Sequence, residues 1–358
     1  MGTEDHPEEG KGRRRVRLIV TVGVVAAVGC AAYVLWKRRQ PKLIATPERR
    51  VSSKRPVLII NPGSGGGKAA KIDLVASAAK LGLETIVRKE GQKLQAIAES
   101  AVDDGCDHLL IAGGDGSQAR IAKVAMERDV AFSVVPSGTR NHLAMDLGLD
   151  RSEPAKALSA AFDGVEFLID VGKIGKRVFV NNASFGVYAD AIADPDYRSH
   201  KAQSIADAAA ANAEHPEKGL SVTDPDGNVH DEIGMLLASN NPYQYIGAPD
   251  FAGRAALDTG TLGVIVADRE AVGGRGRGEL KEWTTPKLVV ESTEKKVPVG
   301  IDGSLRKVKA PVKVRIKRAA LRVVLPTDVV KRQIQNAPGM TEEALAHLSG
   351  VPVSDDEE

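Results

Sequence analysis

The sequence predicts an α/β protein, in which an N-terminal α/β domain with a parallel sheet precedes a C-terminal, mostly β sandwich domain, the whole preceded by one transmembrane helix. Three observations carry this prediction. Residues 18–36 contain no charged side chain, strand and helix patterns alternate four times from Val57 onward, and short strand patterns separated by turns follow from Phe167. Strands that alternate with helices are typical of a parallel sheet covered by helices.

Composition excludes several classes of protein. The 358 residues are enough for two domains with their own cores, and the net charge of +2 does not favour a nucleic acid as partner. The chain has two cysteines, Cys30 and Cys106, without a CxxC pair or a Cys/His cluster. Disulfide and zinc scaffolds are therefore not supported. The sequence leaves the oligomeric state open.

The uncharged run Leu18–Trp36 is close to the roughly 20 residues that a helix needs to cross a bilayer. Arg and Lys clusters flank it on both sides, and Tyr33 and Trp36 are placed as interfacial aromatics. We expect a tail over 1–17, a membrane helix over 18–36 and a linker over 37–55. A cleaved signal peptide and a lipoprotein signal ending at Cys30 are the alternatives, and the run continues past both sites to a basic stop-transfer flank.

The α/β domain is expected over residues 56–165. Apolar strand patterns at 57–60, 83–89, 108–114 and 131–136 are each followed by a helical pattern. In such a sheet the ligand crevice lies at the carboxyl ends of the strands.

The β-rich domain is expected over 166–326, because strand patterns recur there at short intervals. Val312, Val314 and Ile316 alternate with Lys313, Arg315 and Lys317, as in a strand with one buried face. Helical patterns are expected at 200–215 and 273–283. Residues 327–358 are expected to form a C-terminal tail, whose end, 341–358, is expected to be solvated after a short helix.

Three glycine-rich turns fall at the carboxyl ends of predicted strands. They are "NPGSGGGK" (61–68), "GGDGS" (113–117) and "PSGTRN" (136–141). Glycines let the backbone approach an anion, and amides at a helix start donate to it, which points to phosphate. The first turn is not a Walker A loop, since Gly63 and Lys68 are one residue too close, and it does not fit GxGxxG.

Asp115 lies between the glycines of the middle turn. A carboxylate repels phosphate, so it gains a role there by holding magnesium or by accepting a proton from an attacking hydroxyl. Both roles belong to phosphoryl transfer. The alternative is a helix cap for the segment that begins near Ser117.

These turns resemble signatures of the diacylglycerol kinase catalytic-domain group of lipid kinases, which includes bacterial lipid kinases and the sphingosine and ceramide kinases. "NPGSGGGK", "GGDGS" and "PSGTRNHLAMDLGL" are similar to its first three elements, and "NNASFGVYADA", "GAPDFAGRAALDTGTLGV" and "VGIDGS" follow in the same order. The resemblance implies an α/β nucleotide-binding domain (56–165) that binds ATP and a β-rich lipid-acceptor domain (166–326), with ATP and the lipid meeting between them.

The resemblance also implies site residues. Asp115 and Asp302 are the expected catalytic residues, and Asp115 is also the expected Mg²⁺ ligand. The residues expected to bind ATP are Asn61, Gly63, Ser64, Gly65, Gly113, Gly114, Asp115, Gly116, Ser117, Gln118, Thr139 and Asn141.

The chain departs from the family pattern at five places, of which Ser117 replaces the usual Thr but keeps a hydroxyl. Ser304 replaces a glutamate that is a candidate general base in the family. Asp115, supported by Asp302, is then left to act as the base. Thr259 stands beside Asp258 where some relatives bind a structural metal, and Arg140 and His142 flank Asn141 in place of the commoner Gly and Asp. Arg140 either neutralises phosphate charge or is a surface residue.

The expected function is therefore transfer of the γ-phosphoryl group of ATP to the hydroxyl of diacylglycerol or a related lipid alcohol. The membrane helix supports a lipid substrate, and use of ATP places the catalytic part on the cytoplasmic side of the membrane. Two alternatives stay open. A NAD kinase shares the glycine-aspartate turn, and a membrane-tethered nucleotide- or lipid-binding protein without catalysis is compatible with Ser304.

Overall fold

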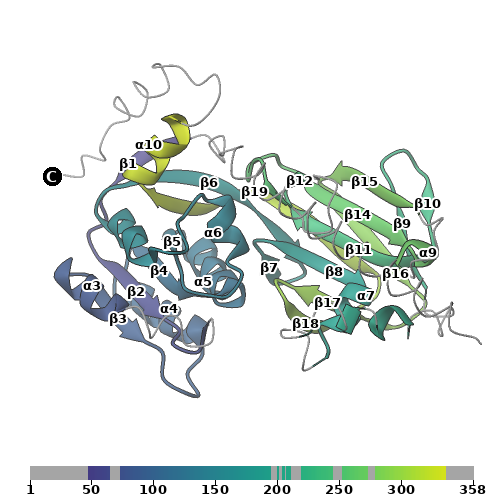
Figure 1. Ribbon diagram of the computed structural model, residues 1–358, viewed down its shortest axis with the longest axis horizontal. Coiled ribbons are helices and arrows are strands. Elements are labelled where there is room, and N and C mark those ends of the chain that lie inside the picture. Colours follow the sequence, from purple (N-terminus) through teal and green to yellow (C-terminus); the bar gives the residue numbers. More distant parts are fainter. Residues whose placement is uncertain are drawn as a thin grey trace, which may run out of the picture. The chain divides into compact units, whose positions relative to one another are not determined.

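A computed structural model describes residues 47–64, 73–194, 200, 204–205, 207–210, 219–244, 252–272 and 279–335 (Figure 1). The chain divides into two compact units, one of Pro41–Pro242 with Gly253–Glu358 and one of Met1–Gln40 with Tyr243–Ala252. The fold and the site below belong to the first unit. The predicted membrane helix, 18–36, lies outside the described residues. In the part of the chain that is described, no helix is both long and apolar enough to span a bilayer.

Four parallel strands form the sheet of the α/β lobe, in the order β5-β4-β2-β3. They are β2 (Pro56–Ile60), β3 (Glu84–Val87), β4 (His108–Gly113) and β5 (Ala131–Pro136). The helical segments of this lobe are α3 (Leu74–Lys80), α4 (Leu94–Asp103), α5 (Asp115–Arg128), α6 (His142–Asp146) and the 3₁₀ helix η2 (Pro154–Ala161). The parallel sheet predicted from the alternating pattern is confirmed.

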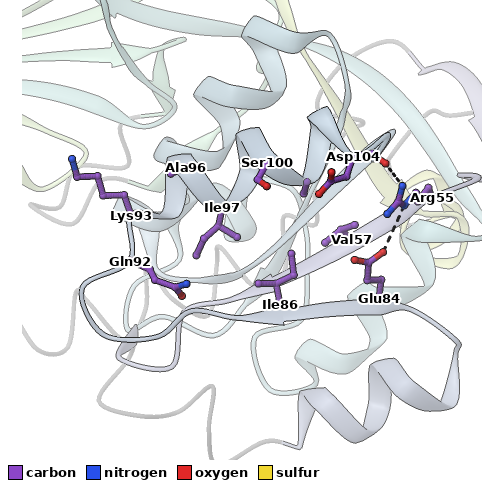
Figure 2. Close-up of a pocket in the computed structure, with 11 residues that line it drawn as sticks. Arg55, Val57, Glu84, Ile86, Gln92, Lys93, Ala96, Ile97, Ser100 and Asp104 are labelled. Atoms are coloured by element: carbon purple, nitrogen blue, oxygen red, sulfur yellow. Dashed lines mark hydrogen bonds and ion pairs between the residues drawn. The ribbon is translucent and has the colours of Figure 1, made fainter.

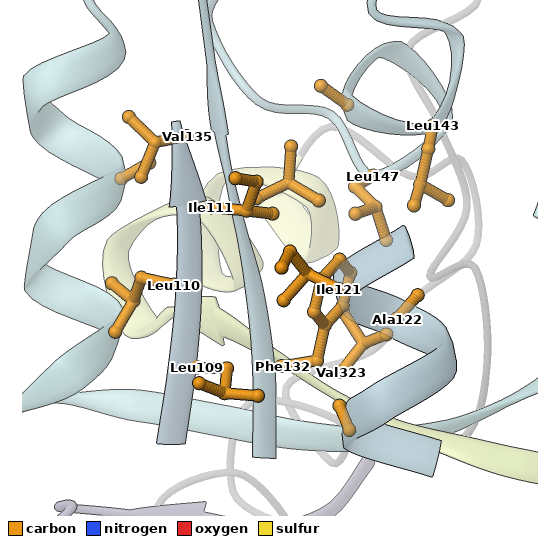
Figure 3. Packing of buried hydrophobic residues seen from close by; sticks show 14 of the residues in the cluster. Leu109, Leu110, Ile111, Ile121, Ala122, Phe132, Val135, Leu143, Leu147 and Val323 are labelled. Carbon is orange, nitrogen blue, oxygen red and sulfur yellow. The ribbon is translucent and has the colours of Figure 1, made fainter. Parts of the chain in front are cut away.

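The core of this lobe lies on both faces of the parallel sheet. Every residue of β2, β4 and β5 is buried, as expected for strands covered by helices on either side. Figure 3 shows side chains of β4 and β5, such as Leu110 and Phe132, with Ile121 of α5 packed among the same cluster. Each such side chain contributes roughly 1.5–3 kcal/mol on full burial. The strand ends that carry the loops are therefore held rigidly.

An antiparallel six-stranded sheet characterises the β-rich lobe, with the order β15-β14-β11-β8-β17-β18 among the described residues. Its strands are β8 (Asn182–Gly186), β11 (Ile233–Asn240), β14 (Leu262–Asp268), β15 (Leu280–Thr285), β17 (Lys296–Ile301) and β18 (Ser304–Lys309). A second core joins this sheet to strands of the other one, as Phe185 and Val264 cluster with Val290 and Val314. This is the packing of a sandwich.

Two long strands continue from one lobe into the other. They are β6 (Gly164–Ile174) and β19 (Val312–Pro326), which pair antiparallel over much of their length. Val323 of β19 lies beside Phe132 of β5, whereas Arg315 lies opposite Lys287 of β16 (Lys287–Ser292). The parallel sheet and one layer of the sandwich are thus a single sheet. The predicted domain limits at 165 and 326 fall within or at the end of these shared strands.

Short elements complete the fold. They are β1 (Pro47–Val51), β7 (Arg177–Phe179), α7 (Val187–Ala191), β9 (Leu220–Thr223), β10 (Val229–His230), β12 (Tyr243–Gln244), β13 (Ala252–Arg254), α9 (Arg269–Val272) and α10 (Thr327–Gln335).

Three segments differ from the sequence-based expectation. β1 occupies the end of the predicted linker and pairs with β6. α10 begins the predicted tail but buries Val329, Val330 and Ile334 in the α/β core, because these residues share one helical face. The helix expected over 273–283 is wrong at residues 280–283, which are strand and pair with β14.

Candidate functional site

The three glycine loops lie at the carboxyl ends of β2, β4 and β5, which are neighbours in the sheet. We call them the first loop (61–64, as far as it is described), the second loop (113–118) and the third loop (136–141). Gly65 lies outside the described residues. Because the strands are parallel, their carboxyl ends meet at one edge, and the loops form one site there.

Asn61 joins the first loop to the second. Its Nδ2 donates to Ser117 Oγ at 2.8 Å and to Ser64 Oγ at 3.0 Å, while its Oδ1 accepts from Arg88 Nη1 at 3.2 Å. Gly113 is required at this junction, since a Cβ there would lie 2.7 Å from the Cβ of Ser117. Ser64 and Ser117, two of the hydroxyl-bearing residues predicted for the site, are thus fixed by one amide.

The second and third loops are in direct backbone contact. A Cβ on Gly138 would lie 2.3 Å from the Cα of Gly114. Asn141 closes the third loop in the left-handed conformation (φ 54°), with Oδ1 accepting from Gly138 N at 3.0 Å and Nδ2 donating to Gly138 O at 2.7 Å. Gln118, fully buried, donates to Gly113 O at 3.0 Å and to Asn141 Oδ1 at 3.4 Å.

Asp115 holds the third loop in place through both carboxylate oxygens. Oδ1 accepts from the amide of His142 at 2.7 Å, and Oδ2 accepts from the amide of Asn141 at 3.1 Å. Asp115 is also the first residue of α5, where the helix dipole stabilises a negative charge. An acid between glycines therefore has a positioning role that the sequence pattern did not reveal, because the donors belong to a loop that comes later in the chain.

The glycine-rich second loop leaves the start of α5 without a side-chain cap. Gly114 occupies the N-cap position, and no described side chain caps the helix. The first amides of a helix have no intrahelical partner and attract anions. The loop therefore offers backbone donors and a positive helix end at the point where the three loops meet.

Asp302 comes to the same site from the turn between β17 and β18. Its Oδ1 accepts from the amides of Asn181 at 2.9 Å and Asn182 at 3.1 Å, and its Oδ2 accepts from Val180 at 2.9 Å. Burial raises the pKa of Asp302 to about 7 against the lowering effect of these three donors, and the charge of Asp115 adds to the rise. This carboxyl group can thus gain or lose a proton near neutral pH.

Asn181 links the two acids, and the sequence analysis did not single it out. Its Nδ2 donates to Asp115 Oδ1 at 3.4 Å, and its Oδ1 accepts from Arg254 Nη2 at 3.2 Å. Arg254 is buried and donates through Nε to Asp146 Oδ2 at 2.9 Å. This buried ion pair ties α6, which follows the third loop, to the β-rich lobe. An arginine and an aspartate so far apart in sequence carry no local signal of their pairing.

The remaining predicted positions differ in their surroundings. Ser304 follows the Asp302 turn, and its Oγ would lie 3.8 Å from a Cβ on Gly116. Thr139 is exposed at the tip of the third loop. Thr259 donates from its amide and its hydroxyl to Asn241 Oδ1 at 2.8 and 2.7 Å, so these hydrogen bonds hold the turn beside Asp258. Burial lowers the pKa of His142.

The acids at the site fit a magnesium ion that substrate oxygens would help to hold. Mg²⁺ is bound in proteins through one or two carboxylates together with phosphates and waters. Among the described residues there is no group of three or more His, Cys, Asp or Glu that could form a complete metal cage. The two nearby carboxylates, Asp115 and Asp302, therefore suit a magnesium ion that is held by one or two carboxylates together with phosphates and waters.

A separate cavity of about 430 Å³ lies along α4, away from the glycine loops (Figure 2). Ile86 of β3 and Ile97 of α4 contribute apolar side chains, and Arg55 pairs with Glu84 at 3.7 Å on its rim. None of the predicted site residues lines this cavity.

The chain is similar in sequence to known proteins. Residues 55–174 match the family described as "Diacylglycerol kinase catalytic domain". A "Diacylglycerol kinase" of Mycobacterium tuberculosis is 29% identical over 130 residues, covering 35% of this chain and 42% of that protein, so the match spans less than half of the relative. A "Probable lipid kinase YegS-like" of Pseudomonas syringae is 26% identical over 237 residues, covering 62% of this chain and 75% of that protein.

The fold is also similar to that of a solved structure. The crystal structure of a diacylglycerol kinase from Bacillus anthracis superposes with a TM-score of 0.55 at 16% identity, covering 78% of this chain and 99% of that one. The chain is thus similar to the diacylglycerol kinase catalytic domain over residues 55–174, and over most of its length its fold is similar to that of a solved diacylglycerol kinase.

Proposed function

We propose that this protein is an ATP-dependent lipid kinase that transfers the γ-phosphoryl group to the hydroxyl of diacylglycerol or a related lipid alcohol. The observation that carries the proposal is the junction of the three glycine loops, in which Asp115 holds the third loop against the second. Phosphoryl transfer depends mainly on positioning and on neutralisation of charge. A rigid junction of backbone donors beside two carboxylates suits both needs.

The second loop and the start of α5 bind the phosphates of ATP in this proposal. The amides of the first turn of α5 donate to phosphate oxygens, and Ser117 and Ser64 are held beside them by Asn61. A Cβ on Gly63 would meet no atom within 4 Å, so a ligand has room to approach the backbone there. Thr139, exposed on the third loop, faces solvent where a phosphate can reach it.

Magnesium would be held by Asp115, with Asp302 nearby. Bound there, the ion would neutralise charge on the phosphate oxygens. The same carboxylate accepts hydrogen bonds from the amides of Asn141 and His142, so Asp115 would bind the ion and position the third loop at once. This dual use explains why an acid is compatible with an anion-binding turn.

Asp302 is the group that we assign to accept the proton of the acceptor hydroxyl. Its pKa of about 7 is suited to a base that operates near neutral pH. Ser304 cannot take this role, because a serine hydroxyl is not basic at neutral pH. A loose transition state asks little of a base, so a single buried carboxylate suffices.

The lipid substrate and the predicted membrane helix belong together in this proposal. A catalytic region tethered to the bilayer through residues 18–36 meets its lipid at high local concentration. ATP is supplied on the cytoplasmic side, so the chain after residue 36 would face the cytoplasm. Protease added outside intact cells should leave this region whole, and its digestion would overturn the orientation.

The test is transfer of labelled phosphate from ATP to extracted lipids by the purified full chain. Asp115→Asn keeps the shape of the side chain but removes its charge, and the matched control Asp103→Asn removes a charge from the exposed end of α4. We expect labelled lipid from the wild type and the control, and at least a hundredfold less from Asp115→Asn. ATP binding without any labelled lipid from the wild type would favour a binding protein over a kinase.

A further inference from the structure

A second cavity, of about 260 Å³, adjoins the glycine loops on the side of α5. Four segments line it: one face of α5 that begins at Gly116, the start of α4 at Gln95, the turn before β7 with the first residues of that strand, and the start of β18 with the end of β17 and the turn between them. Gly116 thus belongs both to the second loop and to this cavity. We call the cavity the basic pocket, for the side chains described next.

Five cationic side chains line the basic pocket. They are Arg120, Lys123, Lys176, Arg177 and Arg306. Lys123 pairs with Glu127, whereas in the described part of the chain the other four form no ion pair with an acid. Cations gathered from separate segments repel each other, so their convergence around one cavity needs a compensating charge.

The single acid of the lining does not supply that charge. Asp302 is buried, and both its oxygens already accept from backbone amides. Ser304, which lines the pocket beside it, is neutral and adds a hydroxyl donor. The lining therefore presents an excess of positive charge and of hydrogen-bond donors.

The position of the pocket makes an anion its natural guest. Gly116 and Arg120 lie on the first turns of α5, where the positive end of the helix dipole adds to the field of the cations. Arginine in particular matches the geometry of phosphate oxygens, and lysine adds a compact charge. A neutral lipid headgroup would leave these donors and charges without partners.

We propose that the basic pocket binds a phosphate group in addition to those that the glycine loops hold. Two sources supply this chemistry: the polyphosphate of the nucleotide, extending past Gly116, and the phosphorylated headgroup of an anionic lipid acceptor. The assignment concerns binding alone, so it stands whether or not phosphate is transferred.

The experiment is titration calorimetry of the full chain with inorganic pyrophosphate at low salt. Lys176→Ala/Arg177→Ala removes two cations from the pocket. Lys295→Ala/Lys296→Ala removes two exposed cations at the start of β17 that do not line the basic pocket. We expect the first variant to bind pyrophosphate roughly tenfold more weakly than the wild type, and the control to bind within about twofold. Equal affinities for all three proteins would overturn the proposal.

Two further ligands distinguish the sources. If the pocket holds a phosphate of the nucleotide, Lys176→Ala/Arg177→Ala loses affinity for ATP but not for glycerol 3-phosphate. A loss of affinity for glycerol 3-phosphate alone assigns the pocket to the headgroup of a lipid. Arg306→Gln, on a different segment, should reproduce the loss for pyrophosphate. Because the substituted side chains are exposed, an unchanged Tm checks that each variant is folded. No loss in either variant would refute the assignment.

Discussion

Substitution of Gly138 by alanine tests the contact between the second and third loops. The added Cβ would lie 2.3 Å from Gly114 Cα, 3.0 Å from Gly114 N and 2.8 Å from Asn141 Oδ1. Carbon atoms rest at about 3.5–4.0 Å from each other, so the loops would have to separate by about 1 Å. Two of these three atoms belong to the backbone, and no rotation of a side chain can relieve the clash.

The magnitude follows from this geometry. Overpacking costs typically about 1–3 kcal/mol, and a clash with backbone belongs at the upper end of that range. Such a cost lowers the Tm by up to roughly 4 °C in a protein of this size. A displacement of about 1 Å at a reacting centre also reduces turnover by about a hundredfold. We therefore expect Gly138→Ala to lose both stability and lipid phosphorylation.

Gly63→Ala is the matched control for stability. Its Cβ would meet no atom within 4 Å, and its backbone is not in the left-handed region. Its free energy of unfolding should change by no more than about 0.5 kcal/mol, as expected for a surface substitution. Differential scanning calorimetry of both variants measures the difference. If Gly138→Ala has the Tm and the turnover of the wild type, the loops do not meet as described.

Three other changes probe the site. The kcat/KM for lipid phosphorylation should rise with pH and level off above about 7, because the carboxyl group of Asp302 is protonated below its pKa. A kcat/KM that stays constant from pH 5.5 to 8.5 would show that Asp302 is not the base. Arg254→Leu leaves Asp146 buried without its partner and should lower the free energy of unfolding in urea by about 3–5 kcal/mol. The double change Asp146→Leu/Arg254→Leu should lower it by less. If the effects of the two single changes add up in the double change, Asp146 and Arg254 do not stabilise each other. Asn61→Ala should weaken ATP binding in calorimetry and cost about 1–2 kcal/mol of stability, since Ser117 loses its donor; unchanged affinity would separate the first loop from the nucleotide.

Local patterns predicted the parts of the fold that depend on local physics. Continuous apolar runs such as Leu109–Ala112 indicated strands buried on both faces, and the parallel order brings their following loops to one edge. β1 was missed because its sequence, PERRV, is charged and only half-buried at the edge of the sheet. α10 was missed because its apolar face is short and follows the last strand directly.

The contacts within the site could not be read from sequence. Asp115 accepts from amides of the third loop, and Asp302 accepts from amides of residues 180–182. In each case the partner is a backbone group, which leaves no trace in residue type. The buried pair of Arg254 with Asp146 likewise joins helix α6 to a distant strand. Such contacts depend on the way in which the shared strands β6 and β19 hold the two lobes together.

The central claim is that the joined loops transfer phosphate from ATP to a lipid. One reaction that contains the full chain, ATP labelled in the γ-phosphate, magnesium, lipid vesicles with diacylglycerol and free NAD measures it most directly. The account predicts label in the lipid fraction, which disappears in Asp115→Asn, and none in NADP. Label in NADP and not in lipid would contradict it and identify the protein as a NAD kinase instead.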